Sequence, residues 1–330
     1  MKKILIFMSL VLLLSGCMKS KDEDLIKNLN NKISSSKSYK IVATLEIYRN
    51  EDKFTYDVES SYKEGDYFKV SLTNKTNNHH QIILKDKNSV YVLTPSLNKS
   101  FKFQSEWPYN NSQIYLLQPI LNDIESDKNS ILKKTKKGYL ITSKVNYSTE
   151  NNFVKQKVTF DNEKNITKVE ILDNDDNVKM VLNIINIEYG LDFEKNYFDI
   201  NKYHVKDESS DGISKHQSST VEDILYPMYV PSDTYLTSQD VITTDDGERV
   251  ILTFSGESTF TFVQENLSND KSLDYVYGDP YLILDTVGSV TDYSVSWISN
   301  GIGYSVMSDA MPIDELLVVA QSVALETVGK

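Results

Sequence analysis

Apolar residues follow a helical spacing near the start of the chain and a strand spacing after it. Four apolar residues have the spacing of one helix face, with steps of one, three and four positions: Leu25, Ile26, Leu29 and Ile33. This spacing predicts one amphipathic helix that ends at the serines 34–36. From Tyr39 to Ile47 every second residue is apolar, which is typical of a strand with one buried face.

Further short runs of alternating residues follow at intervals of about ten positions, as in antiparallel β-proteins. Asn, Asp, Lys or Gly residues bound each run and indicate turns. The predicted strands are 54–62, 67–72, 81–84, 90–93 and 101–103, and then 139–145, 153–160, 166–172 and 180–187. Between the two groups, residues 113–126 have helical spacing, and Pro119 is expected to kink that helix. The pattern therefore predicts two antiparallel meanders joined by a helix.

The turn at residues 173–177 is rich in Asp and Asn, whose oxygens are ligands that calcium prefers. It lacks the central glycine and the downstream glutamate of an EF-hand loop. A hairpin turn is therefore the favoured interpretation.

Residues 207–220 contain almost nothing to bury and predict a linker between two domains, 25–206 and 221–330. In the second domain the pattern predicts strands near 249–255, 260–264, 289–298 and 302–307. A closing helix is expected from Pro312 to about residue 325. Trp297 and Tyr304 fall on facing strands and are expected to form a cross-strand aromatic pair.

The N-terminus has the three parts of a bacterial lipoprotein signal. Lysines at positions 2 and 3 precede an apolar run over 4–14, and Leu-Ser-Gly-Cys then ends at Cys17. A retained membrane-spanning helix is disfavoured because it would need about 20 apolar residues. We therefore expect residues 1–16 to be a cleaved signal peptide, and Cys17 to carry a diacylglycerol at the end of a polar tether, 17–24. This anchor would hold the protein on the extracytoplasmic face of a cell membrane, or of a spore or forespore membrane.

Composition narrows the range of partners and of chemistry. The chain has 47 acidic and 35 basic residues, and its net charge is −12. Only two arginines occur, Arg49 and Arg249, so nucleic acid is excluded as a partner. Cys17 is the only cysteine, so no intramolecular disulfide can form. The 21 tyrosines and 12 phenylalanines favour β-structure.

The order of signal peptide, helix, meander, helix and meander resembles the LolA-like family of lipoprotein-localisation carriers. The local sequence is more similar to Gram-positive sporulation lipoproteins of the YdcC kind, whose relatives include the germination lipoprotein GerS. The C-terminal segments that carry this resemblance are 226–231 (Tyr-Pro-Met-Tyr-Val-Pro), 250–256 (Val-Ile-Leu-Thr-Phe-Ser-Gly) and 260–265 (Phe-Thr-Phe-Val-Gln-Glu). Residues 295–322 look like a module shared with some membrane-associated anti-sigma factors. The resemblance implies a mainly β (α+β) fold: an open antiparallel β-barrel or half-barrel with helices over its mouth, plus a small C-terminal α+β module.

The same resemblance implies a non-enzymatic surface lipoprotein that acts in sporulation or germination. Its partner would be a cortex-modifying amidase or another envelope protein, or its ligand a lipid. A concave sheet can hold an acyl chain, and the residues expected to line it are Leu45, Ile47, Val58, Tyr91 and Leu93. Alternatively, the helices fill this cavity completely. Tethering through Cys17 excludes a long-range shuttle and favours a stationary binder.

No catalytic constellation, metal site or cofactor motif is recognisable. The histidines at 79, 80, 204 and 216 lack zinc-ligand spacing, and neither a nucleophile elbow nor a glycine-rich phosphate loop occurs. Two alternative functions remain. An envelope hydrolase or transferase could assemble its site from scattered carboxylates, and would then have an open polar cleft. A regulatory module related to the anti-sigma factors would need a cytoplasmic segment, which a lipid anchor at Cys17 does not leave.

Overall fold

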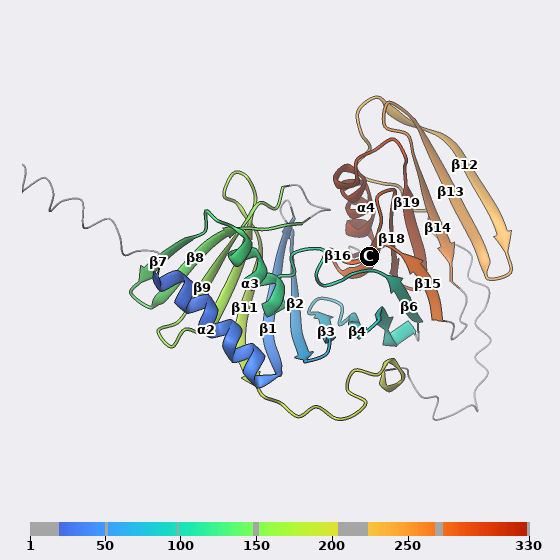
Figure 1. Cartoon of the computed structure of the whole chain (residues 1–330). Helices are drawn as coiled ribbons and strands as arrows, with labels where there is room; N and C mark the ends of the chain where they lie inside the picture. The colour runs from blue at the N-terminus through green and yellow to red at the C-terminus, as the bar shows by residue number, and fades with distance from the viewer. Residues whose placement is uncertain are drawn as a thin grey trace, which may run out of the picture.

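The computed structural model describes residues 20–49, 52–97, 99–147, 152–203, 224–267 and 273–328. Within these ranges the chain is mainly β, with two open sheets and three α-helices (Figure 1). The expected mainly β (α+β) class with unclosed antiparallel sheets is thus confirmed. The signal peptide predicted for 1–16, its acceptor Cys17 and the linker predicted for 207–220 lie outside the described residues.

The first sheet joins both predicted meanders into one layer. Its strands among the described residues are β1 (Ser38–Arg49), β2 (Asp52–Lys63), β3 (Tyr67–Asn74), β4 (His80–Asp86), β5 (Ser89–Thr94), β6 (Lys99–Gln104), β7 (Ile131–Thr135), β8 (Gly138–Lys144), β9 (Lys155–Phe160), β10 (Ile166–Leu172), β11 (Val178–Tyr189) and β15 (Leu273–Tyr277). The spatial order is β15-β6-β5-β4-β3-β2-β1-β11-β10-β9-β8-β7. The junction is β1, which pairs with β2 on one side and with β11 on the other.

Two helices cover the half of this sheet that runs from β1 to β8. They are α2 (Ser20–Ser36) and α3 (Leu117–Ser126), and Figure 1 shows them lying across those strands. The four apolar residues that predicted the first helix are all buried in the core. The helix itself starts at Ser20, inside the stretch 17–24 that the sequence predicted as a tether. No helix of the described ranges has both the length and the apolar character needed to cross a membrane.

The second helix is shorter than the sequence predicted. It begins at Leu117 instead of residue 113, which places Pro119 in its first turn. Backbone N–H groups in a first turn have no partner within the helix, so proline costs nothing there. The buried hydroxyl of Tyr39 accepts the Leu117 N–H (3.2 Å) and donates to Gln118 Oε1 (2.5 Å). A strand residue of the first sheet therefore positions the start of α3.

The second sheet is formed by the C-terminal part of the chain. Its strands are β12 (Thr234–Thr244), β13 (Gly247–Gly256), β14 (Phe260–Asn266), β16 (Asp279–Ile283), β17 (Thr286–Val290), β18 (Ser294–Ser299) and β19 (Ile302–Met307). Their order is β12-β13-β14-β19-β18-β17-β16, and α4 (Ile313–Val328) packs on β18 and β19. Trp297 and Tyr304 are opposite each other, with stacked rings whose centroids are 5.3 Å apart. The predicted aromatic pair is confirmed.

One C-terminal strand completes the first sheet, which the sequence did not predict. It is β15, and it pairs in parallel with β6 at the edge of the twelve-stranded sheet. Gly278 alone separates β15 from β16, so the chain crosses from the first sheet to the second at that residue. Its φ is +94°, and a Cβ there would lie 2.1 Å from the Val290 carbonyl oxygen. The division into 25–206 and 221–330 stays a prediction, and β15 crosses it.

Candidate functional site

The turn of the β16–β17 hairpin is buried inside the molecule, although turns normally lie at the surface. The five residues from Ile283 to Val287 are each at most 4% exposed. Three of them, Ile283, Leu284 and Val287, belong to the same hydrophobic core as the inward-facing residues of β1 to β5. The tip of the hairpin thus occupies the face of the first sheet that α2 and α3 leave open. Full burial of an apolar side chain of this size contributes about 1.5–3 kcal/mol, so Ile283, Leu284 and Val287 fix the tip firmly.

Polar groups of the first sheet receive the backbone of this tip. Gln81 on β4 accepts the Val287 N–H through Oε1 at 2.5 Å and donates from Nε2 to the Val287 carbonyl at 3.3 Å. Its Nε2 also donates to the Thr94 hydroxyl at 3.1 Å. Tyr56 on β2 donates its hydroxyl to the Leu284 carbonyl. Because a buried turn cannot bond to water, these side chains replace the solvent that would otherwise satisfy its backbone.

The base of the hairpin is held separately from its tip. Asp279, the first residue of β16, accepts from the Ser105 hydroxyl through Oδ1 and from Asn110 Nδ2 through Oδ2, the latter at 2.6 Å. Both donors belong to the connection between β6 and α3. The hairpin is therefore fastened at its two ends to different parts of the N-terminal half.

A carboxylate is buried at the tip of the hairpin. Asp285 is only 4% exposed, and its Oδ1 has no hydrogen-bond partner among the described residues. Burial raises the pKa of Asp285 to about 6, and a hydrogen bond from the Asn77 side chain opposes this rise. The charged form is disfavoured because a low-dielectric interior solvates it poorly. Folding therefore keeps this carboxyl group protonated into the mildly acidic range.

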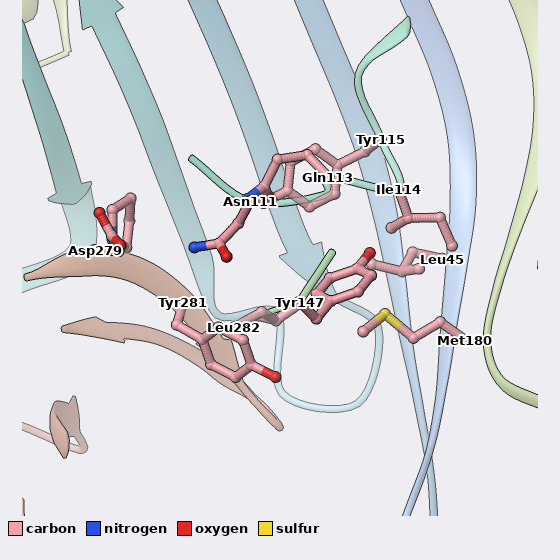
Figure 2. Close-up of a pocket in the computed structure, with 11 residues that line it drawn as sticks. Leu45, Asn111, Gln113, Ile114, Tyr115, Tyr147, Met180, Asp279, Tyr281 and Leu282 are labelled. Carbon is pink, nitrogen blue, oxygen red and sulfur yellow. The ribbon is translucent and has the colours of Figure 1, made fainter. Parts of the chain in front are cut away.

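A small hollow remains beside the base of the hairpin (Figure 2). In Figure 2, Leu45 and Met180 of the first sheet face Tyr281 and Leu282 of β16, and residues 111–115 close the top. Its free volume is about 40 Å³. This is room for a few water molecules and not for an acyl chain.

A larger cavity of about 260 Å³ lies between the two sheets, and residues 287–289 of the hairpin form part of its wall. The first sheet contributes Val92, Phe101 and Phe103 together with β15 residue Val276, while the second contributes Trp297, Ile298 and Tyr304. Gln81, Thr94 and Glu265 supply polar groups at its wall. The indole Nε1 of Trp297 is buried and has no hydrogen-bond partner within the described ranges. The cavity is slightly smaller than the roughly 300 Å³ at which sites for drug-sized molecules begin.

Comparison with known proteins decides the family. No family model matches the chain. The sporulation protein YdcC of Bacillus subtilis (strain 168) is 33% identical to it over 316 residues, which are 94% of this chain and 93% of YdcC. The chain belongs to the YdcC family. The resemblance to YdcC-like sporulation proteins that the sequence motifs indicated is confirmed.

Solved structures with a related arrangement cover either half or nearly all of this YdcC-family chain. A chain from the complex of the CwlD amidase with the GerS lipoprotein of Clostridioides difficile matches 54% of it, at 19% identity and a TM-score of 0.27. In that match 97% of the other chain is covered. A LolA superfamily protein from Nitrosomonas europaea matches 55% of the chain and 98% of its own length, with 9% identity and a TM-score of 0.32. These scores describe a broad likeness only.

The structure of this YdcC-family member does not bring the five predicted lining residues together. Leu45, Ile47 and Val58 face the main core, and Leu45 also lines the small hollow. Tyr91 and Leu93 face the opposite side of the sheet, where Phe198 and neighbouring residues cover them. A lining formed by all five is therefore wrong. The apolar run 90–93 gives no alternation, because β5 is buried on both faces, and its inward side chains are Val90 and Val92.

The residues that receive the hairpin were missed at the level of sequence. Gln81 and Thr94 face each other across β4 and β5, in the same inward row as Leu72 and Val58. A glutamine in an otherwise apolar row was the available signal, since buried polar side chains need partners. The partner lies 206 positions further along the chain, so the signal predicts a contact but not its identity.

Within the described ranges, no group of three or more His, Cys, Asp or Glu residues is placed to hold a metal ion. His80 begins β4 and its Nε2 lies 2.7 Å from the Ser71 hydroxyl.

The turn at 173–177 joins β10 to β11, and Asp173 Oδ1 accepts the Asn177 N–H at 2.8 Å. The predicted hairpin turn is confirmed.

Proposed function

We propose that this protein is a lipid-anchored, non-enzymatic envelope lipoprotein of the sporulating cell that acts by binding a partner protein. The observation that carries the proposal is the buried β16–β17 tip. The face of the first sheet that could hold a lipid is covered over much of its area by α2, α3 and this hairpin. Protein binding at the outer surface is then the main function left to the fold. Membership of the YdcC family supports a role in sporulation.

The lipid anchor is supported by the sequence from Leu14 to Cys17. Metabolic labelling with an alkyne palmitate analogue is expected to mark the wild-type chain and not Cys17→Ala. The control is Ser15→Ala, which keeps the Cys17 thiol and should leave labelling intact. Equal labelling of wild type and Cys17→Ala would refute the anchor.

The partner claim is tested by crosslinking in sporulating cells, with the full-length chain as bait. We expect one envelope protein, a cortex-modifying amidase or another enzyme of the spore wall, to be enriched in the wild type. The same capture from vegetative cells is the control. Enrichment of no envelope protein in sporulating cells, although the bait reaches the membrane, would contradict the proposal.

A second candidate function is the binding of a short apolar ligand, and the inter-sheet cavity favours it. Trp297 lines this cavity, and the other tryptophan, Trp107, is buried elsewhere in the core. Trp107→Phe therefore leaves a single fluorescent reporter at the cavity wall. Brominated decanoate is expected to quench Trp297 at low concentration, and Val92→Phe, which narrows the cavity without adding a second indole, should abolish saturable quenching. Quenching that is linear in decanoate, equal in both variants, would exclude a ligand site there.

A further inference from the structure

The outermost strand of the second sheet has one edge without a partner strand among the described residues. This strand, β12, is eleven residues long and pairs only with β13. Figure 1 shows the β12–β13 hairpin at the far side of the second sheet from the first. A long edge strand presents a row of N–H and carbonyl groups, and natural proteins usually shorten, charge or cover such edges.

Apolar side chains stand on both faces of this free edge. Leu236 and Val241 lie opposite the buried residues Phe254 and Val250, so they are on the core-side face. Tyr235 and Ile242 point to the other face, because they are opposite Ser255 and Arg249. All four are between 42% and 66% exposed. An added strand would therefore find apolar neighbours above and below its backbone.

The core-side face is extended by a neighbouring segment. Tyr226 donates its hydroxyl to Gln239 of β12 (2.7 Å), and Tyr229 donates to Glu315 of α4 (3.4 Å). Met228, between them, is 68% exposed. Residues 226–229 thus connect the free edge to the helix and enlarge the exposed apolar surface. Contiguous surfaces of this kind mark interaction sites.

The charge of this region selects the partner. Between residues 217 and 270 the sequence has ten acidic residues and one basic residue, so this segment carries nine of the chain's twelve net negative charges. The basic residue, Arg249, is paired with Glu265 at 2.6 Å. Exposed carboxylates lie at both ends of β12: Asp233 and Glu257 at one end, Asp245 and Asp246 at the other. A second copy of the chain would bring two such acidic segments together, which like-charge repulsion disfavours.

We propose that β12 is a docking edge for an extended, lysine- or arginine-rich segment of another protein, which adds to the second sheet as a further strand. Backbone pairing with β12 would supply affinity, the apolar side chains would set the register, and the acidic ends would attract the basic flanks. The inference rests on the proposed binding function and names the surface and the partner chemistry for it.

The probe is a synthetic peptide of alternating valine and threonine with two lysines at each end. Fluorescence anisotropy with the full-length chain in detergent is expected to show binding about tenfold tighter than for the same peptide with glutamates in place of lysines. Hydrogen exchange should show slowed amides in β12. A fully N-methylated peptide keeps the side chains and charges but has no backbone donors, and it should not bind.

Two triple variants show whether binding depends on the carboxylates near β12 or only on the net charge of the protein. Asp240 is a further exposed carboxylate within β12. Asp240→Asn, Asp245→Asn and Asp246→Asn together should weaken binding of the lysine peptide about tenfold. The control of Asp52→Asn, Asp57→Asn and Asp292→Asn changes the same number of exposed carboxylates away from β12 and should not. Equal affinity for all peptides, protection outside β12, or protection that grows with chain concentration alone would overturn the inference.

Failure of this inference is distinguishable from failure of the proposed function. If crosslinking in sporulating cells still captures the envelope partner with the Asp240, Asp245 and Asp246 variant, the partner binds elsewhere and only the docking edge is wrong. If wild type captures none, the binding function itself fails.

Discussion

The side-chain amide of Gln81 bonds to both the N–H and the carbonyl of Val287, and so matches in one side chain the two bonds that a paired strand would supply. This contact joins a strand of the N-terminal half to the buried tip of a C-terminal hairpin. The hairpin is also attached through Tyr56 at its tip and through Asp279 at its base.

Replacing Gln81 tests how much the tip depends on this residue. Gln81→Ala leaves the Val287 N–H and carbonyl buried without partners, so we expect a loss of about 1–3 kcal/mol in the free energy of unfolding. Urea unfolding followed by circular dichroism measures it. Gln104→Ala, at an exposed position of β6 in the same sheet, is the control and should change stability little. Equal effects of the two changes would show that the tip does not need the amide.

The buried carboxyl of Asp285 predicts a pH dependence of stability. Burial raises its pKa from the ordinary value of 3.8 to about 6, so the folded chain holds a proton that the unfolded chain has released. The contribution of Asp285 to stability should therefore fall as the pH rises from about 4 to about 6, and stay level above that. Asp285→Asn should raise stability at pH 7 by up to about 3 kcal/mol and reduce this fall.

Asp123, where burial also raises the pKa to about 6, serves as the comparison for Asp285. The Asp123→Asn change should lessen the fall in stability independently, and the double variant should lessen it by about the sum of the two single effects. The exposed Asp292→Asn is the control. An unchanged pH profile in the Asp285 variant would contradict the assigned pKa.

Gly278 should tolerate no side chain. Its positive φ and the 2.1 Å approach of a Cβ to the Val290 carbonyl predict that Gly278→Ala costs more than about 2 kcal/mol. Gly301→Ala is a matched control, because Gly301 also has a positive φ but nothing lies within 4 Å of its Cβ position. Thermal unfolding of both variants separates the steric clash at Gly278 from the backbone strain that both positions share. A smaller loss for Gly278 than for Gly301 would be the contrary result.

The hydroxyl of Tyr39 should contribute to stability because it fixes the start of α3. Tyr39→Phe removes the acceptor of the buried Leu117 N–H, and we expect about 1–3 kcal/mol of destabilisation, with faster amide exchange at the start of α3. Tyr48→Phe removes a hydroxyl that bonds to Glu46 near the surface, and should cost well under 1 kcal/mol. Unchanged exchange in α3 would show that another group fixes the helix start.

Local patterns predicted most elements of this fold, and non-local contacts explain what they missed. The alternation from Tyr39 to Ile47 gave β1 because one face of that strand is buried and the other is not. The strand β15 could not be recognised in this way, since its five residues alternate weakly and its partner β6 is about 170 positions away. The same holds for the site: Gln81 is a polar residue in an apolar strand and was not singled out, and only the fold shows that it receives Val287.

Because the chain returns to the first sheet only just before Gly278, that sheet cannot be completed until most of the protein has been synthesised. A chain made from its N-terminus presents β6 and the inner face of β2 to β5 long before residues 273–290 exist to cover them. Until then the N-terminal half carries an open strand edge and an uncovered apolar wall, both of which promote aggregation. The completed fold is therefore expected to depend on a chaperone during synthesis, and truncation at the predicted linker is expected to yield insoluble protein.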